Sequence, residues 1–154
     1  MPNRPPTAVE TRRHWMSVLA KAHRPEIEDG LRRCVPEAPR YDFLRRPETG
    51  LVMVRGRAGG DGQAFNLGEM TVTRCSVRLP DGTIGHAYVA GRDSRHAELA
   101  AMLDAMLQDE AEGPRLAETL IAPLAAAQIE RRKTASTKAA ATRVDFFTLV
   151  RGDD

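Results

Sequence analysis

The sequence has few of the residues on which several large classes of protein depend. Cysteine occurs only at Cys34 and Cys75 in 154 residues, and this pair fits neither a disulfide framework nor the spacing of a zinc site. No apolar run approaches the roughly 18 residues that a membrane-spanning helix requires, and the first residues lack the apolar core of a secretory signal. We therefore expect a cytoplasmic protein with reduced thiols and no contact with a membrane.

The chain also has little excess of charge of either sign and few aromatic residues. Lys and Arg number 23 against 21 acidic residues, so the net charge is +2, and aromatic residues make up 5% of the chain. Proteins that bind nucleic acid usually carry a basic surface, often with aromatic side chains that stack on bases. Nucleic acid is therefore not an expected partner. The 42% of hydrophobic residues is enough for one domain with its own core.

Helical periodicity is strongest at the two ends of the chain. Residues 1–10 are rich in proline at their start and predict a disordered lead-in, so that the domain spans residues 11–154. Apolar residues at spacings of three and four then indicate amphipathic helices, which proline and glycine interrupt. The expected helices span residues 11–23, 25–34, 96–107, 116–121 and 123–140.

Residues 40–90 are typical of an antiparallel sheet, because Val, Thr and Gly are frequent and turn motifs replace helical periodicity. The expected strands span residues 41–46, 51–57, a short piece around 65, 70–79 and 83–90. "PETG" (47–50) and "LPDGT" (79–83) indicate hairpins, and Gly82 supplies a positive φ in the second. The odd-numbered residues of 71–79 should form the drier face, which receives the helices. The predicted fold class is α+β, with a predominantly antiparallel sheet flanked by N-terminal and C-terminal helices.

The stretch "GRDSRHAELAAMLDAML" (91–107) is the best candidate for a binding site. Asp93 or Ser94 can cap the helix that follows, since either side-chain oxygen can accept a hydrogen bond from a free N–H group of the first turn. Arg92, Arg95 and His96 would flank this helix N-terminus and could attract an anion. The alternative is that these charges are only solvated, as is common near helix ends.

Other motifs carry less. "GRAGGDG" (56–62) lacks the Lys-Ser/Thr of a phosphate-binding loop, and the four histidines form no pair with metal-ligand spacing. No serine lies in a nucleophile motif. From the residues alone, we expect no catalytic set and no metal site built by this chain.

The C-terminal segment "TRVDFFTLVRGDD" is apolar and β-branched, which is unusual at an exposed terminus. In an extended segment Phe146 and Phe147 point to opposite sides, so one surface cannot cover both. We therefore predict that residues 143–151 dock onto a partner; the alternative is a final strand or tail packed on the protein's own helices. The expected interface residues are Arg143, Asp145, Phe146, Phe147, Leu149 and Arg151.

Several long strings resemble one family in the same order. They include "FNLGEMTVTRCSVRL" (65–79), "HAELAAMLDAML" (96–107) and "TRVDFFTLVRGD" (142–153). The chain resembles the PhnG family, a subunit of the bacterial carbon-phosphorus lyase system, from about Arg12 to Asp153. The resemblance implies a core complex with PhnH, PhnI and PhnJ that acts with PhnL in phosphonate catabolism.

The resemblance also implies a reaction. Together with these partners, PhnG-like subunits support attack of a phosphonate on the ribose of MgATP, which releases adenine and gives α-D-ribose 1-methylphosphonate 5-triphosphate. In the family, the nucleosidase chemistry is credited chiefly to PhnI and the radical cleavage to PhnJ. We therefore expect a subunit of a transferase that binds no cofactor by itself and has no activity alone. It would be either a scaffold or a direct contributor to anion binding through Arg92, Arg95 and His96.

Overall fold

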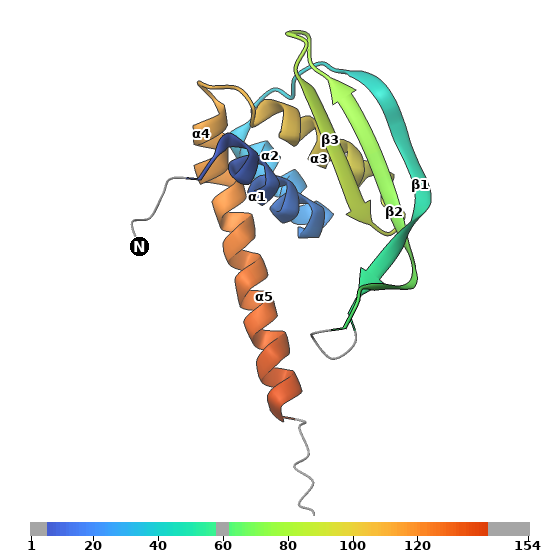
Figure 1. Cartoon of the computed structure of the whole chain (residues 1–154). Coiled ribbons are helices and arrows are strands. Elements are labelled where there is room, and N and C mark those ends of the chain that lie inside the picture. The colour runs from blue at the N-terminus through green and yellow to red at the C-terminus, as the bar shows by residue number, and fades with distance from the viewer. Residues whose placement is uncertain (1–5, 58–61, 142–154) are drawn as a thin grey trace, which may run out of the picture.

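Helices from both ends of the chain pack against one antiparallel sheet (Figure 1). The structure, a computed structural model, describes residues 6–57 and 62–141. Within these residues the sheet has three strands in the order β1-β2-β3, which confirms the predicted α+β class. The strands are β1 (Asp42–Gly56), β2 (Phe65–Arg78) and β3 (Ile84–Ala90). The helical elements are α1 (Ala8–Lys21), α2 (Arg24–Cys34), α3 (Ser94–Met106), α4 (Gly113–Leu116), the π-helical turn η1 (Ala117–Ile121) and α5 (Ala122–Ala141).

Helix α1 begins earlier than the sequence predicted. Thr7 caps it, because its side chain accepts from the Glu10 N–H while the Glu10 carboxylate accepts from the Thr7 N–H at 2.7 Å. Residues 8–10 are therefore helical and do not belong to a disordered lead-in. The start of α2 agrees with the prediction, with Pro25 in its first turn.

The last helices form one continuous helical segment, although the sequence predicted a break at Pro123. Pro123 has no N–H to donate to the Thr119 carbonyl four residues earlier. In the structure that carbonyl lies in η1 and accepts from the Cys34 thiol of α2, at 3.6 Å. The π-helical turn accommodates the proline ring within the helical segment. The Cys34 thiol donates to the Thr119 carbonyl oxygen, to which Pro123 cannot donate.

The expected hairpin at "PETG" is also wrong, since β1 runs through it as one strand. Pro47 lies where the pairing of β1 with β2 shifts register between Arg45 and Glu48. Because β1 is an edge strand and this part of it is irregular, a residue without an N–H is tolerated. The "LPDGT" hairpin is confirmed: Gly82 has a φ of 93°, and its N–H donates to the Leu79 carbonyl at 2.9 Å.

The core lies between the sheet and α3, and α1 packs against both α3 and β3. Thr73, Cys75 and Val77 of β2 are buried, as the predicted alternation requires, together with the inward residues of β3, although Val72 on the other face is buried as well. The approach of α3 to β3 is very close at Gly85, where a β-carbon would lie 1.9 Å from the Ala101 carbonyl oxygen. Leu103 of α3 is completely buried.

One buried carboxylate joins three elements of the core. Asp104 of α3 accepts from the Arg12 guanidinium of α1 at 2.7 and 3.1 Å, and from the Trp15 indole N–H at 2.8 Å. It also accepts from the backbone N–H of His86 in β3, at 2.9 Å. A buried charge is stable only when it is paired and hydrogen-bonded, and Asp104 meets both conditions.

Among the described residues, no helix is both long and apolar enough to cross a bilayer.

Candidate functional site

The N-terminus of α3 has the cap that the sequence predicted. Asp93 is the N-cap, and its side chain accepts from the His96 N–H at 2.9 Å. Its second oxygen pairs with the Arg24 guanidinium of α2, at 3.1 Å. Ser94 is the first helical residue and has no capping role. The cap therefore uses Asp93 both to begin α3 and to join α3 to α2.

The three residues predicted to bind an anion do not converge. Arg92 is exposed, whereas Arg95 pairs with Glu98 at 3.1 Å. His96 is only 7% exposed, and its Nε2 lies 2.7 Å from the Leu19 carbonyl oxygen of α1, to which it donates. The expectation that His96 faces an anion is wrong, because this residue is in phase with the buried stripe that continues at Leu103. That helical phase was visible in the sequence.

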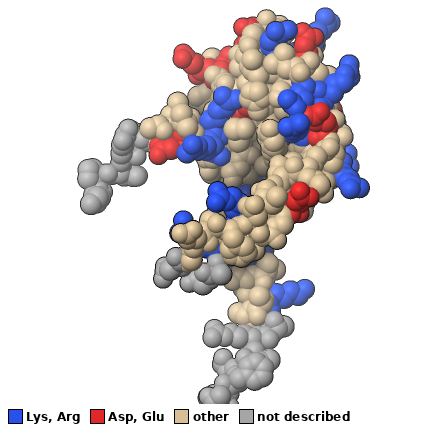
Figure 2. Space-filling view, turned by 45° about the vertical axis from the view of Figure 1, so that its right-hand side comes forward, with Lys and Arg blue, Asp and Glu red and all other residues tan. Residues whose placement is uncertain are grey.

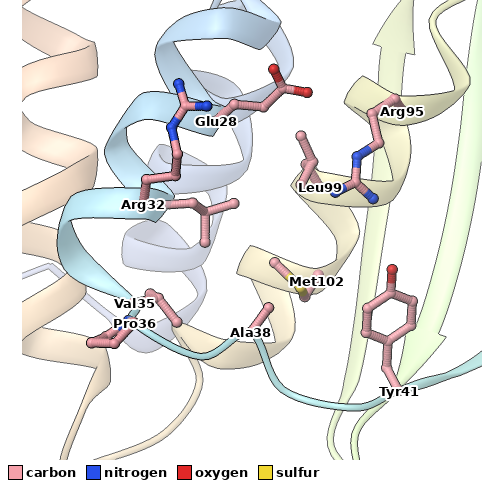
Figure 3. A pocket seen from close by; sticks show the side chains of 10 residues that line it. Glu28, Arg32, Val35, Pro36, Ala38, Tyr41, Arg95, Leu99 and Met102 are labelled. Carbon is pink, nitrogen blue, oxygen red and sulfur yellow. The ribbon is translucent and has the colours of Figure 1, made fainter.

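A cavity of about 450 Å³ lies next to this site, between α2, α3 and the segment 35–41. Figure 3 shows Arg95 and Tyr41 on one side of it and Glu28 and Arg32 on the α2 side. Leu99 and Met102 lie between them, and Val35, Pro36, Ala38 and Leu31 complete the lining. Sequence reasoning missed this cavity, because its residues come from three separate segments.

The polar groups of the cavity satisfy one another. The Tyr41 hydroxyl donates to the Glu98 carboxylate, which also pairs with Arg95. Burial, and then the hydrogen bond to Glu98, raise the pKa of Tyr41 to about 12, so the phenol stays protonated at neutral pH.

Partners of opposite charge also hold the two charged residues on the α2 side. Glu28 lies 3.6 Å from Arg24, and Arg32 pairs with Asp29. Since every charged side chain in the lining has a counter-charge, the cavity suits an apolar or amphipathic group better than a polyphosphate.

The remaining predicted site residues lie outside the described part of the chain. These are Arg143, Asp145, Phe146, Phe147, Leu149 and Arg151 of the C-terminal segment. Their role as a partner interface stays a prediction.

Cys75 lies in the core. Burial and the nearby Glu98 carboxylate raise the pKa of its thiol to about 11, so Cys75 stays protonated at neutral pH.

The comparisons with known proteins decide the family. Residues 10–152 match the family model described as Phosphonate metabolism protein PhnG. The chain belongs to the PhnG family. It is also 45% identical, over 149 residues, to the alpha-D-ribose 1-methylphosphonate 5-triphosphate synthase subunit PhnG of Rhizobium meliloti (strain 1021). This alignment covers 95% of the chain and 92% of the relative.

Membership of the PhnG family agrees with the resemblance noted in the sequence. The family match includes the sheet, all the described helices except the first residues of α1, and most of the C-terminal segment. The cavity between α2 and α3 therefore lies within the part of the chain that matches the PhnG family model.

Proposed function

We propose that this chain is a subunit of an α-D-ribose 1-methylphosphonate 5-triphosphate synthase and acts in phosphonate catabolism. The observation that carries the proposal is the 45% identity to a subunit of that synthase over 95% of the chain. The expected partners are PhnH, PhnI and PhnJ in a core complex, together with PhnL. MgATP is a substrate of the complex, and this chain binds no cofactor by itself. We place the complex in the cytoplasm, in agreement with two free thiols at Cys34 and Cys75.

The role of the chain in this complex is that of a scaffold. The charged groups around the α2–α3 cavity are already paired, and the Tyr41 phenol and the Cys75 thiol stay protonated at neutral pH. Large apolar side chains are exposed on the sheet, which favours contact with another protein. The isolated chain should therefore show no turnover.

The alternative is a direct contribution to binding the triphosphate or phosphonate. After His96 is removed from the predicted site, this role would fall to Arg92, which precedes α3, and to Arg95 in its first turn. A guanidinium that contacts the phosphate groups would be expected to affect KM or turnover, not assembly.

The double variant Arg92→Ala/Arg95→Ala separates the two roles. The reconstituted complex is first checked for intact composition, and adenine release from MgATP with methylphosphonate is then measured. The scaffold role predicts normal assembly and a change in turnover of less than about threefold. Loss of turnover in an intact complex would favour the direct role. Glu130→Ala/Lys133→Ala on α5 is the matched control, because it removes an exposed pair far from α3.

A further inference from the structure

The two edges of the sheet are treated differently. At the β3 edge, the His86 N–H donates to Asp104 at 2.9 Å, and the Ile84 carbonyl accepts from the Gln108 side chain at 2.9 Å. Asp104 of α3 and Gln108 of the turn that follows α3 thus occupy backbone groups that would otherwise pair with another strand. This is one of the ways in which proteins protect an edge strand.

The β1 edge is protected only in its first half. There, Pro47 and two shifts of register interrupt the strand, and Glu48 pairs with Arg74 at 2.6 Å and with Arg45. From Thr49 to Val54 the pairing with β2 continues without a shift, and the sequence "TGLVMV" contains no proline and no charge. In the described part of the chain, no strand lies on the outer side of β1.

The same half of β1 extends beyond the rest of the sheet. The last pair between β2 and β3 is Val72 with Ala90, so residues 51–56 and 65–71 form a two-stranded ribbon without a third strand. Figure 1 shows this ribbon projecting past the end of β3. A two-stranded ribbon alone is only marginally stable in water, so a further contact is expected.

Both faces of the ribbon carry exposed apolar side chains. Leu51 is 62% exposed and Met53 is 53% exposed, and the alternation from Thr49, which bonds to the buried Thr73, places them on the helix side. Val52 and Met70 are a cross-strand pair and share the opposite face. Phe65 and Leu67 are also exposed. Figure 2 shows mostly uncharged side chains, with few Lys, Arg, Asp or Glu, on this ribbon. A helix packed on the ribbon could cover the apolar side chains of one face only, whereas a strand added to the edge of β1 continues both faces.

We propose that the β1 edge from Thr49 to Val54 binds an extended segment of another synthase subunit, which adds to the sheet as a fourth strand. This inference rests on the proposed function. Unpaired backbone groups on β1 give the affinity, and the apolar side chains select a segment that is apolar on both faces. Arg55 and Arg57 are exposed at the end of this edge, and within the described residues neither forms an ion pair. The bound segment therefore carries an acidic residue beside them.

A second copy of the chain fits this edge less well. An antiparallel self-pairing about a two-fold axis is centred on one residue, and centred on Leu51 it would place Arg45 of one copy opposite Arg57 of the other. Glu48 would face the uncharged Val54 in this register, and it already pairs with Arg74. Like charges opposite each other destabilise a strand pair. The edge thus favours a different chain as its occupant.

The test uses the complex reconstituted from the tagged full chain and its partner subunits. The variant Leu51→Lys/Met53→Lys places two charges in the new strand pair without disturbing the core, because both side chains are exposed. Tyr88→Lys on β3 is the matched control, since Tyr88 is 55% exposed on the same sheet but lies at the other edge. Thermal melting of each free variant checks the fold. We expect at least a tenfold lower yield of partner subunits with the double variant and a normal yield with Tyr88→Lys.

Hydrogen exchange then distinguishes strand addition from side-chain packing. In the free chain, the amides of residues 49–54 that point away from β2 should exchange quickly. In the complex they should become protected, while residues 84–90 should not change.

Each other outcome has a distinct meaning. If the wild-type chain captures no partner subunit, the proposed function itself fails. Normal capture by Leu51→Lys/Met53→Lys would overturn only the strand proposal, and so would outward amides that stay fast in the complex. If the wild-type chain alone is a dimer that the double variant dissociates, the occupant is a second copy and the proposal is wrong.

Discussion

Asp104 gives the sharpest test of what holds the fold together. In Asp104→Ala, the Trp15 indole N–H and the His86 backbone N–H lose the acceptor that they contact at 2.8 and 2.9 Å. Each buried donor left without a partner costs roughly 1–3 kcal/mol. Arg12 is 34% exposed, so water can solvate its freed guanidinium, and we add nothing for it. The free energy of unfolding should therefore fall by about 2–6 kcal/mol.

Urea unfolding followed by circular dichroism and Trp15 fluorescence measures this loss. Asp104→Asn should fall between the wild type and the alanine variant, because one carbonyl oxygen remains but the new NH₂ group faces donors. Glu130→Ala is the control, since its pair with Lys133 is exposed and such pairs contribute little. A loss below about 1 kcal/mol in Asp104→Ala would show that the carboxylate does not join α1, α3 and β3 as described.

Three further predictions concern the core. Gly85→Ala should destabilise the protein by about 1–3 kcal/mol in the same urea assay, because its β-carbon would meet the Ala101 carbonyl oxygen at 1.9 Å. Gly50→Ala is the control and should be nearly neutral, since there is open space around Gly50; equal effects of the two variants would refute the close approach. Leu103→Ala should cost roughly 2–5 kcal/mol, and a value under about half a kcal/mol would mean that this face of α3 is not core. Burial and the Glu98 carboxylate raise the pKa of Cys75 from 9.0 to about 11, so the stability that this protonated thiol contributes should be present below pH 9 and lost as the pH rises towards 11. For the same reason, the Cys34→Ser variant, in which Cys75 is the remaining cysteine, should react with a thiol reagent at pH 8 only after unfolding. Rapid reaction of the folded Cys34→Ser variant would contradict the buried position of Cys75.

The sequence predicts most of the architecture, because periodicity reports which residues face the core. The alternation in 71–79 and the apolar stripe of 96–107 both lie where they were expected. The errors occur at prolines. Pro47 and Pro123 were interpreted as breaks, yet an edge strand tolerates the first and a π-helical turn accommodates the second. Both explanations depend on neighbours in space, which local rules do not include.

The candidate site was less predictable than the fold. Asp93 was recognised as a cap, since capping depends on the next three residues alone. His96 was assigned by its charge, although its helical phase indicates burial. The cavity depends on Tyr41 and Glu98, which are 57 positions apart, and Asp104 contacts Arg12 across 92 positions. Such pairs appear only once the fold is known.

The most direct test of the central claim is the composition of the assembly that the chain forms with its proposed partners. The tagged full-length chain is co-expressed with PhnH, PhnI and PhnJ and purified, and the mass of the product is determined by native mass spectrometry. We predict one stable complex that contains this chain together with the other subunits. Recovery of the folded chain as a monomer, with the partners present but not bound, would contradict the claim that it is a subunit of the synthase.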